Sequence, residues 1–220
     1  MNLFGALNAT TRVTPYLFLG SIDSLNKDKI RQLGVSMVIN CAKEIPNVNL
    51  PGVEVIKLDI DDIPSAKIED YFDQCSDLIR SVKNRNGHVL VHCAAGVSRS
   101  ASICLAYLMK HHGMSLRRAY SHLKVKRPII RPNVGFFRQL MEYEKKLFGN
   151  SSVCLVRSRL GLVPDVYADT IPPGLHFPAQ NLPASYTAPY PHVSSRFHYT
   201  SLANSIPYRF GNDLSRRWSP

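Results

Sequence analysis

Gly87-His88-Val89-Leu90-Val91-His92-Cys93-Ala94-Ala95-Gly96-Val97-Ser98-Arg99-Ser100 is the stretch that decides the fold. Its first six residues form a short, nearly continuous apolar run, which is typical of a buried parallel strand. From Ser100 to His112 the chain is apolar on almost every side, as in a helix packed in the interior, and Gly113 ends that helix. A strand, a tight loop and a buried helix are therefore predicted in that order.

The loop between this strand and helix is suited to bind an anion. Unpaired N–H groups and the positive end of the helix dipole stabilise negative charge at a helix N-terminus. Arg99 adds a planar, bidentate guanidinium that fits phosphate better than a Lys would. Gly96 lets the turn close without a Cβ clash. We predict that a phosphate dianion binds the backbone N–H groups of Ala94, Ala95, Gly96, Val97, Ser98 and Arg99.

Cys93 lies at the floor of this loop, six positions before Arg99. Helix N-termini and cationic neighbours lower a thiol pKa from about 8.5 to roughly 3.5–7.5. We therefore expect Cys93 to be ionised and nucleophilic at neutral pH. Ser100 is placed to hydrogen-bond the sulfur and stabilise it as a leaving group. His92 is too close in sequence to act as a conventional base, and we expect it to orient the loop.

Two other interpretations of this stretch are weaker. A buried structural Cys followed by a solvated Arg does not account for the strand and helix on either side. A metal site needs a second Cys or His pair at ligand spacing, and the sequence has none. We expect neither a metal nor another cofactor.

His92-Cys93, Gly96, Arg99 and Ser100 match HCxxGxxRS, the signature of cysteine-dependent protein phosphatases. From about Thr14 to Gly149 the chain resembles a small atypical dual-specificity phosphatase. The segment from Leu90 to Gly149, which includes Arg127-Pro128-Ile129-Ile130-Arg131-Pro132-Asn133-Val134-Gly135-Phe136, is similar to the MAP-kinase-phosphatase-6 group. The resemblance implies hydrolysis of phosphotyrosine and phosphoserine or phosphothreonine through a phosphocysteine, with MAP kinases among the substrates.

Attack on a phosphoester also needs a general acid on a loop that reaches over the pocket. Asp59, Asp61 and Asp62 compete for this role. In the resembled family the acid precedes an aliphatic residue by six positions and an aromatic pair by nine and ten. Asp62 meets this spacing with Ile68, Tyr71 and Phe72. We therefore predict that Asp62 is the acid, and that it later acts as base on the hydrolytic water.

Asn133 has two predicted roles. In the resembled family an Asn at this point hydrogen-bonds the phosphate loop, which is residues 93–99 in this sequence, and stabilises it. Asn133 also follows Pro132 and precedes an apolar run from Val134, as a helix N-cap does. We class it as a supporting residue.

Outside the loop the sequence alternates between strand and helix patterns. Strands are predicted over 16–19, 35–40 and 53–58, a polar helix over 24–34, a helix from Ile68 to Val82, and two more helices after Gly113 that end near Gly149. These elements predict an α/β domain, with a central, mostly parallel sheet flanked by helices and a ligand site at the carboxyl end of a strand.

Four segments are predicted. Residues 1–13 form an N-terminal lead-in, 14–149 the catalytic domain, and 150–170 an extension that can pack on it. Residues 171–220 are rich in Pro, Ser and Tyr and poor in charge, which predicts a disordered tail. We expect neither a secretory signal nor a membrane span, because no long apolar run occurs. Five cysteines without framework spacing favour a reducing compartment. We expect a cytoplasmic protein that also occurs in the nucleus or in association with mitochondria.

The net charge of +11 is concentrated around the loop, because no Asp or Glu occurs between Asp77 and Glu142. A positive field there attracts phosphorylated, acidic proteins. The basic residues are not interleaved with stacking aromatics, so no nucleic-acid partner is expected. Small, uncharged loop side chains favour a phosphoprotein over an inositol lipid. The alternative, a phosphoprotein-binding module without turnover, has no chemical need of an intact Cys93, Arg99 and Asp62. The oligomeric state is left open.

Overall fold

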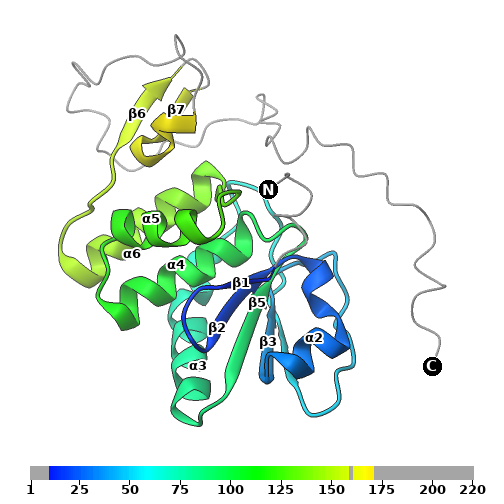
Figure 1. The fold of residues 1–220 in the computed structure, drawn as a ribbon. Coiled ribbons are helices and arrows are strands. Elements are labelled where there is room, and N and C mark those ends of the chain that lie inside the picture. The colour runs from blue at the N-terminus through cyan, green and yellow to red at the C-terminus, as the bar shows by residue number, and fades with distance from the viewer. Residues whose placement is uncertain (1–9, 159–160, 171–220) are drawn as a thin grey trace. The chain divides into compact units, whose positions relative to one another are not determined.

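The computed structural model describes residues 10–158 and 161–170, and its centre is a five-stranded sheet (Figure 1). The strand order is β1-β2-β5-β3-β4. Strands β2, β5, β3 and β4 are mutually parallel, while β1 pairs antiparallel with β2 and lies within the predicted lead-in. The strands are β1 Thr11–Arg12, β2 Leu17–Gly20, β3 Val35–Asn40, β4 Glu54–Lys57 and β5 His88–His92. The predicted mostly parallel α/β class is confirmed.

Helices cover both faces of the sheet. In Figure 1, α2 lies on one face and α3 and α4 lie on the other, with α5 and α6 packed against α4. The helices are α2 Lys27–Gln32, α3 Phe72–Asn84, α4 Arg99–His112, α5 Leu116–Lys126 and α6 Val134–Phe148, with short 3-10 turns η1 Ile22–Leu25, η2 Ile68–Tyr71 and η3 Asp165–Thr170. Within the described residues, no helix has the length and apolar character needed to cross a membrane.

The apolar strands are buried on both sides, and alternate residues enter two separate cores. Leu17, Val89 and Val91 belong to the larger core, with residues of α3 and α4, whereas Phe18 and Leu90 belong to a smaller core that includes residues of α2. Side chains of successive strand residues point to opposite faces, so a strand between two helical layers must be apolar throughout. This explains the uninterrupted apolar run before Cys93.

The polar helix predicted over 24–34 is two elements in the structure. Asn26 has an extended backbone between η1 and α2, and its side chain accepts a hydrogen bond from the Lys29 N–H at 3.1 Å. An N-cap of this kind ends one element and begins the next, because the cap residue itself is not helical.

The chain after Gly149 continues in a small antiparallel pair, β6 Leu155–Ser158 and β7 Gly161–Pro164, followed by η3. Tyr167 of η3 is buried; its ring contacts the rings of Tyr120 and Phe137, and its hydroxyl donates to the Pro132 carbonyl at 2.6 Å. The extension therefore touches the segment that leads into α6. The predicted tail, 171–220, and residues 1–9 of the lead-in lie outside the described residues.

Candidate active site

Cys93 follows the last residue of β5, the central strand, and the loop after it leads directly into α4. The Cys93 side chain is buried, and its Sγ accepts hydrogen bonds from the Gly96 N–H at 3.3 Å and the Ser100 hydroxyl at 3.2 Å. Both donors are of the kind that stabilises an anionic sulfur. The contact with Ser100 is the one that the sequence analysis predicts.

The other described cysteines lie in different surroundings. Burial raises the pKa of Cys75 to about 12, and it also raises the pKa values of Cys41 and Cys104. These three side chains are buried thiols of the core. Cys154 is exposed, and its pKa is raised by partial burial and by the Asp165 carboxylate, whose Oδ2 lies 3.0 Å from its sulfur. None of the four is a rival nucleophile at neutral pH.

The carbonyl side of the loop is held by its neighbours. The guanidinium of the buried Arg127 donates to the carbonyls of Ala95 at 3.0 Å and Gly96 at 2.8 Å. The neighbouring carbonyls of Ala94 and Val97 accept the backbone N–H groups of Ile22 and Arg131 at 3.2 and 2.9 Å. Four consecutive carbonyls of the loop therefore have partners outside it, while the Gly96 N–H donates to the Cys93 sulfur. Arg127 is not among the site residues predicted from the sequence.

Gly96 is required at the centre of this turn. Its φ is +67°, and a Cβ there would lie 2.6 Å from the Gly20 carbonyl oxygen and 2.7 Å from the Arg127 guanidinium. Both the left-handed backbone and the lack of space exclude a larger residue.

Arg99 begins α4, and its guanidinium is nearly buried. Nη1 and Nη2 donate to the two carboxylate oxygens of Glu44 at 2.7 Å each, and Nη1 also donates to the Ile60 carbonyl at 3.1 Å. Burial opposes the charge, but Glu44, Cys93 and Asp62 raise the pKa of Arg99. The two Nη groups of Arg99, which were predicted to bind phosphate, thus contact Glu44. A phosphate would therefore approach Arg99 Nε, which has no hydrogen-bond partner among the described residues.

Glu44 lies in the turn after β3, and two polar side chains hold that turn in place. The Lys57 ammonium donates to the carbonyls of Ala42 at 2.8 Å, Lys43 at 3.1 Å and Ile45. The Asn40 side-chain amide donates to the Ile45 carbonyl at 2.9 Å. Glu44 is not among the site residues predicted from the sequence. One feature of the sequence could have indicated it: Glu44 lies just beyond the carboxyl end of β3, the strand beside β5. Residues of ligand sites in parallel sheets lie at that edge.

Glu44→Gln is expected to lower kcat/KM about tenfold, the cost of a charge-assisted hydrogen bond that orients Arg99. Although partial burial opposes ionisation, the hydrogen bond from Arg99 lowers the pKa of Glu44. The contact is therefore present above the usual Glu pKa and is lost as the pH falls through the lowered value. Steady-state kinetics at pH 7 check this, with Glu54→Gln, an exposed residue of β4, as the control. Equal kinetics for the two variants would contradict it.

Asp62 is the acidic residue of its loop that contacts the phosphate loop. Its Oδ1 accepts hydrogen bonds from the Ser98 hydroxyl at 2.7 Å and the Asn133 amide at 2.9 Å, and its Oδ2 lies 3.6 Å from Arg99 Nε. Its side chain is 31% exposed, so solvent and a leaving group can reach it. Asp61 pairs instead with Lys43 at 3.4 Å.

Asn133 joins this network and also caps a helix. Its backbone N–H donates to the Ser98 hydroxyl at 3.1 Å, and its side-chain oxygen accepts the Phe136 N–H at 2.9 Å. The two roles predicted for Asn133 therefore coexist in the geometry. The side chain joins the loop that carries Asp62 between β4 and η2, here called the acid loop, to the phosphate loop and to the start of α6.

His92 is buried beside Cys93, and its Nδ1 has no hydrogen-bond partner among the described residues. Burial lowers the pKa of His92 to about 4, although a backbone hydrogen bond with Cys93 opposes the shift. The ring is neutral at pH 7, which fits a positioning role.

Gly135→Ala is expected to separate the acid loop from α6. A Cβ at Gly135 would lie 1.9 Å from the Pro64 carbonyl oxygen, so the backbone next to Asp62 or Asn133 must move. Overpacking of this kind costs about 1–3 kcal/mol. We expect both a lower free energy of unfolding, measured in urea, and a lower kcat.

Gly113→Ala is the matched control for that experiment. Gly113 has φ +61° at the far end of α4, and a Cβ there would have no neighbouring atom within 4 Å. Its replacement costs stability through backbone strain but leaves kcat unchanged. A Gly135→Ala chain with normal kcat would mean that the acid loop tolerates the displacement.

A thiol at the floor of an anion-binding loop, an arginine at the helix N-terminus and a carboxylate beside them define the class: a cysteine-dependent phosphatase. The family model "Dual specificity phosphatase, catalytic domain" matches residues 17–146. The chain is 49% identical over 165 residues to dual specificity protein phosphatase 14 of Bos taurus, which covers 74% of this chain and 83% of that protein.

Two further comparisons agree. Dual specificity protein phosphatase 21 of Homo sapiens is 43% identical over 158 residues, covering 71% of this chain and 83% of that protein. The crystal structure of human DUSP28 superposes with a TM-score of 0.61 at 34% identity, covering 63% of this chain and 94% of that one. This chain belongs to the dual-specificity phosphatase family and is a protein phosphatase. Its placement in the MAP-kinase-phosphatase-6 group stays a prediction.

Proposed function

We propose that this phosphatase hydrolyses phosphotyrosine and phosphoserine or phosphothreonine in proteins through a phosphocysteine at Cys93. The observation that carries the proposal is the set of donors around the Cys93 sulfur, with Arg99 and Asp62 beside them. The phosphate-binding residues are the loop N–H groups from Ala94 to Arg99. His92 and Asn133 support the loop.

In the first step the Cys93 sulfur forms a bond to phosphorus, and the bond from phosphorus to the substrate oxygen breaks. Arg99 and the loop N–H groups stabilise the charge on the equatorial oxygens. Asp62 gives its proton to the departing oxygen, so the leaving group is released as a neutral alcohol or phenol. The exposed edge of the Asp62 carboxyl suits a group that must meet an incoming substrate.

In the second step a water attacks phosphorus and the phosphorus–sulfur bond breaks. Asp62, now ionised, takes the proton of that water. The Ser100 hydroxyl, 3.2 Å from the sulfur, donates a hydrogen bond to the departing thiolate. Inorganic phosphate leaves, and the enzyme returns to its starting state.

The substrate side of the proposal rests on the loop side chains. Ala94, Ala95 and Val97 bring no charge to the pocket, which suits a phosphoprotein better than an inositol lipid with several phosphates. Within phosphoproteins, we include MAP kinases as candidate substrates because of the resemblance to MAP-kinase phosphatases.

The test compares turnover of a synthetic aryl phosphate with turnover of singly and doubly phosphorylated kinase-loop peptides that carry phosphotyrosine, phosphothreonine or both. Acid quench followed by intact-mass measurement looks for one phosphoryl group on Cys93. We expect release of phosphate from both residue types and a trapped phosphocysteine. Tight binding of the peptides without release of phosphate would favour the binding-module alternative.

A further inference from the structure

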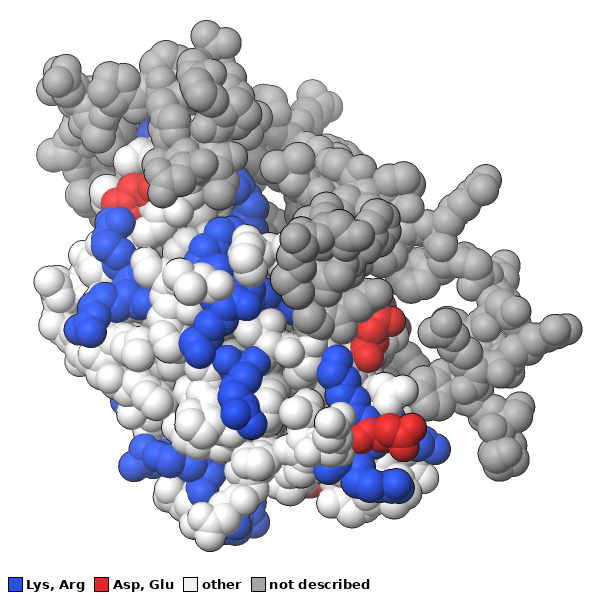
Figure 2. Space-filling model, viewed as in Figure 1, with Lys and Arg blue, Asp and Glu red and all other residues white. Residues whose placement is uncertain are grey.

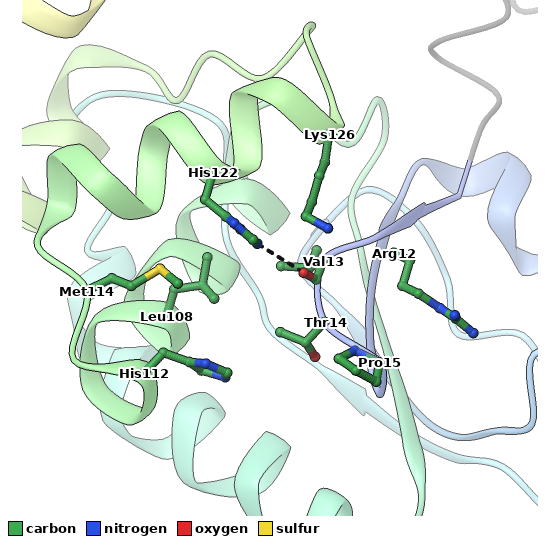
Figure 3. A pocket seen from close by; sticks show the side chains of 9 residues that line it. All are labelled: Arg12, Val13, Thr14, Pro15, Leu108, His112, Met114, His122 and Lys126. Atoms are coloured by element: carbon green, nitrogen blue, oxygen red, sulfur yellow. Dashed lines mark hydrogen bonds between the residues drawn. The ribbon is translucent and has the colours of Figure 1, made fainter.

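A cavity of about 360 Å³ lies at the end of α4 that is remote from the phosphate loop. Figure 3 shows its walls: Leu108 and His112 from α4, and Met114 after it, face the segment Val13–Pro15, while His122 and Lys126 come from α5. Thirteen residue steps of 1.5 Å separate His112 from Arg99, about 20 Å along the helix. The His112 end of the cavity therefore lies about 20 Å from Arg99, while Arg12 and Lys126 on its other side adjoin Thr11 and Arg127, which is bonded to the loop carbonyls.

The floor of this cavity is apolar. Val13, Pro15, Leu108 and Met114 line it, and the first and third of these are buried in the core. His122 contributes a ring nitrogen 3.2 Å from the Val13 carbonyl, which fixes one wall (Figure 3). A hollow of this size and lining accommodates an aliphatic or aromatic side chain from another molecule.

The rim is basic. Arg12 and Lys126 line the cavity and are exposed, and Lys83 lies close by with its ammonium 5.0 Å from the centre of the Tyr16 ring. No carboxylate in the described ranges forms an ion pair with these three residues. Burial and the charges of Lys83 and Arg80 lower the pKa of His112, so the local field is positive.

The surrounding surface has the same sign. Figure 2 shows Lys and Arg side chains in several patches across the face viewed there, with Asp and Glu at a few places near its margin. The cause is the absence of acidic residues between Asp77 and Glu142, a stretch that includes α4 and α5. Such a field attracts acidic partners over a Debye length of about 8 Å at physiological salt.

The chain itself holds no complement to this rim in its terminal segments. Residues 1–9 have no charged side chain, and residues 171–220 have four Arg and one Asp. Neither of these two segments supplies the acidic side chains that would balance the rim. The apolar floor favours a peptide over a nucleic acid, because a base inserted there would bury its polar edge atoms without hydrogen-bond partners.

We propose that this cavity and its basic rim, the residues Arg12–Pro15, Leu108, His112, Met114, His122 and Lys126, form a docking site for an acidic peptide segment that inserts one apolar side chain. The segment belongs to a phosphoprotein substrate, so this part of the inference rests on the proposed function. An extended chain spans the roughly 20 Å between His112 and Arg99 in about six residues, so a segment seated at the His112 end needs a spacer of that length to reach the phosphate loop.

The test uses an unphosphorylated, fluorescein-labelled peptide in which Glu residues flank one Leu, and follows its anisotropy. We expect saturable binding that the double variant Arg12→Glu/Lys126→Glu weakens at least tenfold. Met114→Asn, which makes the floor polar, should weaken it several-fold. The control Lys27→Glu/Arg31→Glu makes the same charge change on exposed residues of α2 and should change the Kd less than twofold.

Turnover of a small aryl phosphate separates this inference from the proposed function. It should be the same in all these variants, which also shows that each one is folded. A peptide that joins the acidic segment to phosphotyrosine through six or more residues should have a KM at least tenfold lower than its Glu→Gln counterpart, with an unchanged kcat.

Three results would overturn the docking site. The peptide does not bind saturably; the α2 control weakens binding as much as the rim variant, which means general charge attraction; or an oligonucleotide binds with the same dependence on Arg12 and Lys126 and none on Met114. Loss of aryl phosphate turnover in the parent chain would instead count against the proposed function.

Discussion

Cys93→Ser is expected to abolish turnover of every phosphoester substrate while phosphopeptide affinity stays within a few fold of the parent. A serine hydroxyl in the same place remains protonated and is a far weaker nucleophile than a thiolate, so no covalent intermediate forms. The backbone of the loop and Arg99 are unchanged, so the phosphate site persists. Phosphate release and peptide anisotropy, measured on the same preparation, check both parts.

Two serine variants serve as controls for that experiment. Cys154→Ser replaces an exposed thiol in the extension, and Cys104→Ser replaces a buried thiol of α4. The first should keep full activity, and the second should lose stability more than activity. Residual turnover above about 1% in the Cys93 variant, which corresponds to a barrier only ~2.7 kcal/mol higher, would mean that another group attacks phosphorus.

Asp62→Asn is expected to lower kcat about 10²- to 10⁴-fold on phosphoserine and phosphothreonine, the range of general-acid catalysis. The alkoxide released from these substrates is a poor leaving group that needs a proton. An aryl phosphate with an electron-poor ring needs that proton far less, so its hydrolysis should fall much less. The asparagine can still accept hydrogen bonds from Ser98 and Asn133, which preserves the loop.

The neighbouring carboxylates test this assignment. Asp59→Asn should keep a kcat close to that of the parent on the same phosphoserine and phosphothreonine substrates. Asp61→Asn should behave like Asp59→Asn, because Asp61 is exposed and pairs with Lys43. An equal loss on aryl and alkyl substrates would show that Asp62 positions Arg99 rather than transferring a proton.

The sequence predicts those parts of the site that are formed by residues adjacent in the chain. The apolar run of β5, the small residues of the loop and the helix after it are contiguous, so their order in space follows from their order in the chain. Asp62 could be selected over Asp59 and Asp61, and Asn133 given a role at the phosphate loop, only through resemblance to a family, although the helix-capping role of Asn133 follows from its neighbours in the chain. Their contact with Ser98 depends on how η2 and α6 pack, which no short pattern contains.

Glu44 and Arg127 show where sequence reasoning stops. Each is an ordinary charged residue in its own segment, and each acquires its role only when the sheet order places β3 beside β5, or when α5 ends against the phosphate loop. Most charged residues lie on the surface, and nothing in the sequence around Arg127 indicates that its side chain is buried. The polar helix over 24–34 was predicted too long because Asn26 works as a cap.

The contact between Tyr167 and Pro132 bears on where this protein can be trimmed for biochemical work. A fragment limited to 14–149 would lose the strand at Thr11–Arg12 and the Thr11 hydroxyl that accepts from Arg127 at 3.3 Å. It would also lay bare the rings of Tyr120 and Phe137, which Tyr167 covers. The shortest fragment that keeps these contacts should therefore begin before Thr11 and extend past Tyr167.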